Sequence, residues 1–114
     1  MKSLRATIPL RDIRRAAREI GKLFRVRRVI LFGSYARGSA YRESDVDFLV
    51  IADTRRPIDL AGRILLQLGG RFASDVLVRT PREIQRALRD QDSFLTSILE
   101  EGRVLYEERR TRVG

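Results

Sequence analysis

The chain has 114 residues, of which 43% are hydrophobic, and it carries a formal net charge of +9 with neither cysteine nor histidine. This length and apolar content predict one globular domain over residues 1–114. The lack of cysteine excludes disulfides and thiolate metal sites, and the lack of histidine excludes imidazole chemistry and the usual zinc sites. Any metal site must therefore use oxygen ligands, which favours magnesium or manganese.

The positive charge comes almost wholly from arginine and favours an anionic partner, whether a nucleotide, RNA or an acidic protein surface. Genome composition or adaptation to heat also produces arginine-rich surfaces, so the charge alone decides nothing. No apolar run approaches a membrane span, and the N-terminus lacks the hydrophobic core of a signal peptide. We therefore expect a cytoplasmic protein.

The first quarter of the chain predicts a helix followed by a buried strand. Residues 8–24 have helical apolar spacing, with Thr7 as a candidate cap, Pro9 in the first turn, and one apolar face formed by Ile13, Ala16, Ala17, Ile20 and Phe24. Arginines on the other face could touch nucleic acid, but a solvated helix face is the favoured interpretation. Residues 26–32 form an apolar run typical of a strand covered on both sides.

The rest of the chain alternates strands and helices. The pattern predicts strands at 45–52 and 72–79, helices at 58–68, 80–90 and 93–101, and a short edge strand at 104–106 before a loose charged tail. Two helices have inward-facing apolar positions, namely Leu60, Ile64, Leu65 and Leu68 in one and Phe94, Leu95, Ile98 and Leu99 in the other. Thr80 and Glu83 form a capping-box pattern. This order predicts an α/β fold, a small mixed β-sheet flanked by helices.

Two aspartates begin the second predicted strand. Because strand side chains alternate, Asp45 and Asp47 should emerge on one face. Their like charges repel each other, and a divalent cation would neutralise them. The alternative is that the pair only ends a loop, with Ser44 and Asp45 as a turn signal.

A third carboxylate, Asp75, lies inside the apolar strand at 72–79, where an ionised group is normally costly. If this strand pairs beside the preceding one, Asp75 completes a cluster with Asp45 and Asp47. Such a cluster can hold two metal ions about 4 Å apart, as in-line displacement at phosphorus requires. Asp75 is then the candidate general base. The alternative is an edge-strand residue that faces solvent.

A glycine–serine pair precedes the carboxylates. Gly33 stands between a buried strand and a short helix, where it lets the backbone approach a ligand closely. The first amides of that helix suit a phosphate, and the Ser34 hydroxyl can add a hydrogen bond. Arg37 could neutralise phosphate charge, or it could point to water.

Together these residues resemble a known family signature. Gly33-Ser34, ten intervening residues and Asp45-Val46-Asp47 are similar to the Gly-Ser-x10-Asp-x-Asp motif of the DNA polymerase beta-like nucleotidyltransferases. The flanking segments 31–38 and 44–50 look like the minimal nucleotidyltransferase branch of that superfamily. Asp75 stands where the family places its third carboxylate, and residues 98–106 are similar to the end of these small domains. The resemblance covers nearly the whole chain, although the N-terminal helix is generic.

The resemblance implies transfer of AMP from ATP to a hydroxyl group, with release of pyrophosphate and dependence on magnesium. Asp45 and Asp47 would bind both metal ions and Asp75 the catalytic one, while Gly33 and Ser34 would hold the triphosphate. Members of this branch often act as the antitoxin of a type VII pair and modify a tyrosine of a HEPN ribonuclease toxin. Unlike larger relatives, the sequence shows no separate acceptor-binding domain, which favours an acceptor brought by a partner protein.

Two other functions stay open. One is a nucleotidyltransferase that acts on a small molecule or an RNA end, and the other is a binding module that neutralises its partner by contact. The intact trio of Asp45, Asp47 and Asp75 argues for catalysis, because binding alone needs no buried carboxylates. Base preference, partner identity and oligomeric state do not follow from the sequence.

Overall fold

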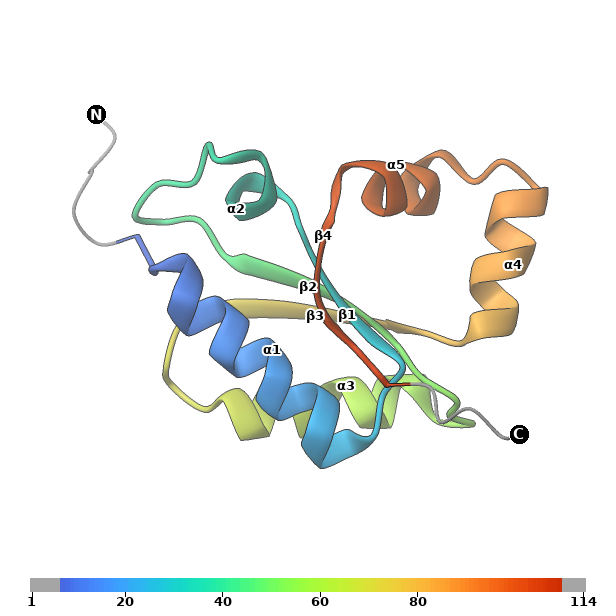
Figure 1. Ribbon diagram of the computed structural model, residues 1–114, viewed down its shortest axis with the longest axis horizontal. Helices are drawn as coiled ribbons and strands as arrows, with labels where there is room; N and C mark the ends of the chain where they lie inside the picture. Colours follow the sequence, from blue (N-terminus) through green and yellow to red (C-terminus); the bar gives the residue numbers. More distant parts are fainter. Residues whose placement is uncertain (1–6, 110–114) are drawn as a thin grey trace.

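The computed structural model describes residues 7–109 as a four-stranded sheet with helices on both faces (Figure 1). In chain order the elements are α1 (Leu10–Phe24), β1 (Arg28–Phe32), α2 (Ser34–Arg37), β2 (Val46–Ile51), α3 (Pro57–Leu68), β3 (Ser74–Arg79), α4 (Pro81–Arg89), α5 (Ser93–Glu101) and β4 (Arg103–Glu107). The predicted mixed sheet flanked by helices is confirmed. Within residues 7–109, none of the helices combines the length and the apolar character that crossing a bilayer requires.

The strands follow the order β3-β2-β1-β4. Strand β1 runs antiparallel to both β2 and β4, whereas β2 and β3 are parallel and are joined through α3. The two central strands are covered on both faces, which explains their continuous apolar runs. Strand β4 forms one edge of the sheet, as the sequence predicted.

The helices divide between the two faces of the sheet, with α1 and α3 on one side and α4 and α5 on the other (Figure 1). The first face holds the larger core, whose fully buried side chains include Ile13, Ile20, Leu31, Phe48 and Ile64. The second face holds a smaller core of Ile30, Leu49, Ile51, Ile84, Ala87, Leu95 and Ile98. Alternation along β1 and β2 sends successive side chains to opposite cores.

The helix ends follow the predicted capping in one case and depart from it in another. Thr80 Oγ1 accepts from the Glu83 amide at 3.1 Å and Glu83 Oε1 accepts from the Thr80 amide at 2.8 Å, which confirms the capping box on α4. In α1 the N-cap residue is Pro9 and no side chain caps the helix. The predicted Thr7 cap was therefore wrong, because the helix begins only at Leu10 and leaves Thr7 outside its first turn.

Two apolar side chains that were predicted to point inward are exposed. Leu65 is 40% exposed because the buried positions of α3 recur every four residues, at Leu60, Ile64 and Leu68, which leaves Leu65 on the flank. Phe94 is 55% exposed because it lies in the first turn of α5, where its ring meets the Phe32 ring edge to face, with centroids 6.2 Å apart.

The predicted strand boundaries were too wide. Strand β2 begins after Asp45, which lies in the preceding loop, and β3 begins two residues later than the pattern indicated. Apolar residues outside the hydrogen-bonded ladder, such as Val26 and Phe72, extended the pattern because they pack on the α1/α3 core. The expectation of a loose charged tail after Glu107 falls mostly on residues 110–114, which lie outside the described residues.

Candidate active site

The register of the sheet sets Asp47 between Phe32 and Asp75. Phe32 on β1 lies directly opposite Asp47 on β2, and Asp47 lies opposite Asp75 on β3. Opposed residues on adjacent strands share a face, so the three side chains form one row across the sheet. Ile30 and Leu49 stand two positions along the strands from Phe32 and Asp47, so they share this face, and both belong to the core under α4 and α5. The row therefore lies on the α4/α5 face, and the predicted pairing of Asp75 beside Asp47 is confirmed.

Charge also links Asp45 to this row. Asp45 is exposed, immediately before β2. The pKa of Asp47 is raised from its ordinary value, first by partial burial and then by the negative charges of Asp75 and Asp45, while the Arg37 guanidinium opposes the rise. Asp47 therefore lies within the electrostatic reach of both other carboxylates, and Arg37 offsets part of their effect.

The carboxylates approach one another without forming a preformed cage. Within residues 7–109, no three Asp or Glu side chains stand close enough together to hold a metal ion between them. The backbone register brings Asp47 and Asp75 side by side, and the loop before β2 adds Asp45. The expectation of buried carboxylates was wrong for Asp45 and Asp75, which are both exposed, Asp75 because β3 is an edge strand. Each can therefore change rotamer without leaving a packed core. The predicted three-ligand set stays a prediction at the level of side chains.

Gly33 fits tightly against the carboxylate row. Its φ of +76° is one that residues with a side chain rarely adopt, and a Cβ atom there would overlap Asp47 Oδ2. The strand-to-helix turn therefore requires glycine for both conformation and space. As a result, the first turn of α2 lies directly beside the Asp47 carboxylate.

Helix α2 presents polar groups next to this turn. The amides of Ala36 and Arg37 donate to the Gly33 carbonyl at 3.1 and 3.2 Å, whereas those of Ser34 and Tyr35 have no acceptor within the helix. Ser34 is half-buried and Arg37 is exposed. Since the charge of Arg37 acts on Asp47, its guanidinium belongs to the surroundings of the carboxylates rather than to open solvent alone.

Two contacts that the sequence did not indicate fix the position of α2. Arg103 Nε donates to the Ala36 carbonyl at 3.1 Å, and the Tyr35 hydroxyl accepts from the Ile8 amide at 3.1 Å. Both partners are far away in the sequence, so local pattern carries no sign of them. The only hint was that Arg103 belongs to the closing segment that resembles the family.

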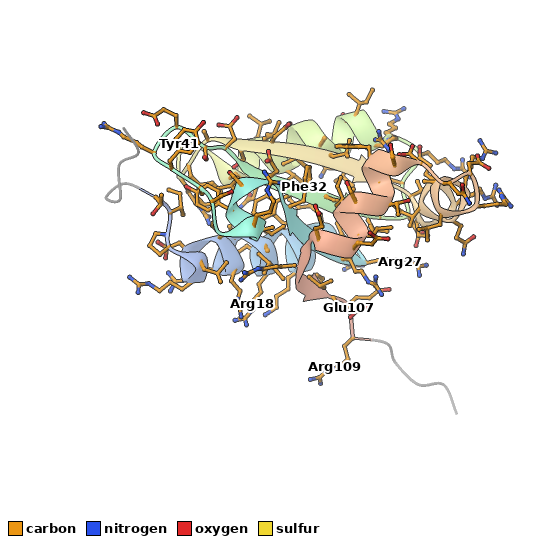
Figure 2. All side chains as sticks on the ribbon, turned by 90° about the horizontal axis from the view of Figure 1, so that it is seen from above. Arg18, Arg27, Phe32, Tyr41, Glu107 and Arg109 are labelled. Carbon is orange, nitrogen blue, oxygen red and sulfur yellow. The ribbon has the colours of Figure 1, made fainter. Side chains whose placement is uncertain are left out.

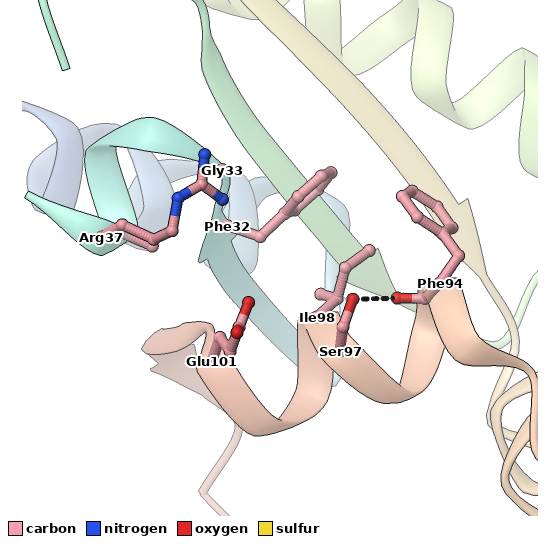
Figure 3. Close-up of a pocket in the computed structure, with 8 residues that line it drawn as sticks. Phe32, Gly33, Arg37, Phe94, Ser97, Ile98 and Glu101 are labelled. Carbon is pink, nitrogen blue, oxygen red and sulfur yellow. Dashed lines mark hydrogen bonds between the residues drawn. The ribbon is translucent and has the colours of Figure 1, made fainter. Parts of the chain in front are cut away.

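A cavity of about 230 Å³ opens beside the glycine turn, between the end of β1, α2 and α5 (Figure 3). Its lining residues are Phe32, Gly33, Ala36, Arg37, Phe94, Ser97, Ile98 and Glu101. Sequence reasoning singled out Gly33 and Arg37 but gave no functional role to Phe32 or Glu101. Phe94 was assigned to the core, and helical spacing alone could not distinguish a core position from the wall of a cavity.

The arginines on the exposed face of α1 lie away from the carboxylate row and the cavity. Arg11, Arg14, Arg15 and Arg18 are all exposed, and Figure 2 shows Arg18 extending outward from α1 rather than toward Phe32. Other arginines form surface ion pairs, including Arg27 with Asp53 at 2.6 Å and Arg71 with Glu19 at 2.5 Å. The positive charge is therefore spread over the molecule, with Arg37 as the member that acts on Asp47.

Comparison with known proteins identifies the family. A family model described as a nucleotidyltransferase domain matches residues 10–108, which is most of the chain. The protein therefore belongs to the nucleotidyltransferase domain family, as the glycine–serine and aspartate motif indicated, and it is a nucleotidyltransferase.

Two relatives come from Methanocaldococcus jannaschii and are provisionally named protein adenylyltransferases. The first, MJ0604, is 39% identical over 84 residues, which cover 72% of this chain and 80% of that protein. The second, MJ1305, is 38% identical over 87 residues, which cover 69% of this chain and 57% of that protein.

Three solved structures share the fold at lower identity. A nucleotidyltransferase from Sulfolobus solfataricus matches with a TM-score of 0.58 and 19% identity, over 86% of this chain and 79% of that one. A chain of a toxin–antitoxin complex with AMP-PNP matches with a TM-score of 0.53 and 24% identity, over 83% of this chain and 73% of that one. A chain of a mutant MntA–HpeT toxin–antitoxin complex matches with a TM-score of 0.54 and 21% identity, over 90% of this chain and 75% of that one. At these identities the likeness supports the fold alone.

Proposed function

We propose that this nucleotidyltransferase transfers AMP from ATP to a hydroxyl group of a partner protein. The observation that carries the proposal is the row formed by Asp75 and Asp47, with Gly33 packed directly against the Asp47 carboxylate. This arrangement puts a candidate phosphate site and candidate metal ligands next to each other. The two relatives named protein adenylyltransferases support AMP as the group transferred and protein as the acceptor.

Asp45, Asp47 and Asp75 are the residues that would hold two magnesium ions, with manganese as the alternative. They fit such ions because the donor set consists of carboxylate oxygens and because the negative charges of Asp75 and Asp45 act on Asp47. When bound, the ions would neutralise the charge that develops on the phosphoryl oxygens and lower the pKa of the attacking hydroxyl.

The other proposed roles fall to α2 and to β3. Gly33 lets the triphosphate approach the backbone, Ser34 donates its hydroxyl and first-turn amide to it, and Arg37 neutralises part of its charge. Asp75 is exposed on β3, an edge strand, so an acceptor can reach it from outside. The acceptor oxygen attacks the α-phosphorus, the bond to the bridging oxygen breaks, pyrophosphate leaves on the α2 side, and Asp75 takes the hydroxyl proton.

The acceptor that we propose is a tyrosine of a HEPN-domain toxin, with this protein as the antitoxin of a type VII pair. The shared fold with chains of toxin–antitoxin complexes, one of them with AMP-PNP, supports this assignment. The exposed position of Asp75 also suits an acceptor as large as a folded protein.

The test is a labelling reaction with magnesium, ATP labelled in its α-phosphate and the protein encoded by the neighbouring gene. We expect label on that protein, with Asp45→Asn abolishing the labelling while binding to the partner persists. Asp53→Asn is the matched control, since Asp53 is an exposed aspartate that pairs with Arg27 at the far end of β2. Label on RNA instead would favour an enzyme that acts on RNA ends. If the Asp45→Asn variant still neutralised the partner fully, the protein would act as a binding module.

A further inference from the structure

The cavity between α2 and α5 lies at a defined place relative to the carboxylate row. Across the sheet the order is Asp75 on β3, Asp47 on β2 and Phe32 on β1, and the cavity is lined by Phe32. It therefore lies at the opposite end of the row from Asp75, the proposed base, where the acceptor must approach. A group that belongs to the nucleotide, rather than to the acceptor, suits this position.

One stripe of α5 forms a wall of the cavity. Phe94, Ser97, Ile98 and Glu101 follow the three- and four-residue spacing of a single helix face. Figure 3 shows these side chains pointing from α5 toward the end of β1 and α2. The volume of about 230 Å³ is below the roughly 300–1,000 Å³ of sites for drug-sized molecules, so it fits one ring system rather than a whole nucleotide.

The apolar part of the cavity is aromatic. The Phe32 and Phe94 rings meet edge to face at 86°, and Phe94 remains 55% exposed. A phenylalanine at the mouth of a cavity offers a ring on which a planar ligand can stack, whereas a phosphate or a sugar gains little from it.

The polar groups contributed by α5 are hydrogen-bond acceptors. The Ser97 hydroxyl donates to the Phe94 carbonyl at 2.9 Å, so its oxygen is left to accept. The Glu101 carboxylate can only accept, and within residues 7–109 it forms neither an ion pair nor a hydrogen bond. A ligand that fills the cavity must therefore donate hydrogen bonds toward α5, as the exocyclic amino group of a nucleobase does.

We propose that this cavity is the nucleobase subsite, that Phe94 stacks on the base, and that Glu101 selects bases that carry an exocyclic amino group. The proposal rests on the proposed function, because it assumes that a nucleoside triphosphate lies along Gly33. It adds the base specificity of the site, with adenine accepted and a purine that lacks the amino group disfavoured.

The test measures equilibrium binding by calorimetry, with magnesium and without acceptor, for three probes: ATP, purine riboside 5′-triphosphate and inorganic tripolyphosphate. For the unaltered protein we expect ATP to bind roughly 10- to 100-fold more tightly than purine riboside 5′-triphosphate, the range for a hydrogen bond to a charged group. Glu101→Ala should bring this ratio close to one. Glu100→Ala is the matched control, since Glu100 is the exposed neighbour that does not line the cavity, and it should keep the ratio.

Phe94→Ala should weaken binding of both nucleoside triphosphates roughly 5- to 100-fold and leave binding of tripolyphosphate unchanged. Melting temperatures of all variants exclude loss of fold as the cause. The subsite is wrong if Glu101→Ala keeps the preference for ATP over purine riboside 5′-triphosphate, or if Phe94→Ala binds both as tightly as the unaltered protein does. If the unaltered protein binds neither ATP nor tripolyphosphate, the proposed function itself is overturned, and the subsite with it.

Discussion

The two faces of the sheet differ in what they hold. Under α1 and α3 lies a continuous apolar core, which includes the fully buried Phe48. Under α4 and α5 the core is smaller, and beside it lie Asp47, Asp75 and the cavity. Because side chains alternate, β2 sends Phe48 to the first face and Asp47 to the second. One strand can thus anchor the fold on one side and place charge on the other.

The largest effect on stability should come from a substitution that leaves a cavity in the core under α1 and α3, called the closed face here; the face under α4 and α5 is called the open face. Phe48→Ala removes a fully buried ring and should lower the free energy of unfolding by about 3–5 kcal/mol. Phe32→Ala, on the open face, should lower it by less, because Phe32 is only half-buried. Urea unfolding of both variants measures the difference. Equal losses would show that the two faces do not differ in their contribution to stability.

A smaller effect is expected at the glycine turn. Gly33→Ala should destabilise the fold by about 1–3 kcal/mol and prevent nucleotide transfer, because φ is +76° and the new Cβ would overlap Asp47. Gly62→Ala is the matched control: Gly62 lies inside α3, and a Cβ added there would meet no atom within 4 Å, so alanine should raise stability by about 0.5–1 kcal/mol. Thermal unfolding with a transfer assay separates the two. If both glycine variants retained transfer, the close packing of Gly33 on Asp47 would have no functional meaning.

The fold and the family could be predicted from the sequence because both leave a local pattern in it. Continuous apolar runs marked β1 and β2, and the spacing of Gly33 from Asp47 marked the family. It could not predict the cavity, since Phe94 has the same helical spacing as the core residues Leu95 and Ile98. Nor could it predict the contact between Arg103 and α2, which joins segments 67 residues apart. Both features depend on the tertiary packing of elements that are distant in the sequence, which local pattern does not record.

Removing charge from the open face should slightly stabilise the metal-free protein. The raised pKa of Asp47 means that the folded state holds this proton more tightly than the unfolded chain does. Stability is therefore lost as the pH rises from the ordinary aspartate pKa through the raised one, and it stays lower at neutral pH. Asp47→Asn should remove this loss and gain on the order of 1 kcal/mol or less, since solvent screens the half-exposed site. Unfolding curves from pH 3 to pH 7 with a chelator measure it, and a pH profile that keeps the loss in the variant would contradict the account.

The smallest effect belongs to a surface pair on the closed side. Arg71 donates to Glu19 and lowers its pKa, so the stability that this pair adds is present above the ordinary glutamate pKa and is lost as the pH falls through the lowered one. Because Arg71 is exposed and Glu19 is only half-buried, Arg71→Ala should cost less than about 1 kcal/mol at pH 7. At pH 2 the variant and the unaltered protein should unfold alike. A large loss that persists at pH 2 would point to packing instead.

In the function that we propose, Asp47 serves chemistry and not stability. The most direct measurement is the rate of magnesium-dependent pyrophosphate release from ATP in the presence of the acceptor, made together with the melting temperature. For Asp47→Asn we predict a rate at least about 100-fold lower and a melting temperature that is equal or higher, while Asp53→Asn keeps its rate. A rate for Asp47→Asn within a few-fold of the unaltered protein would rule out a catalytic role for Asp47.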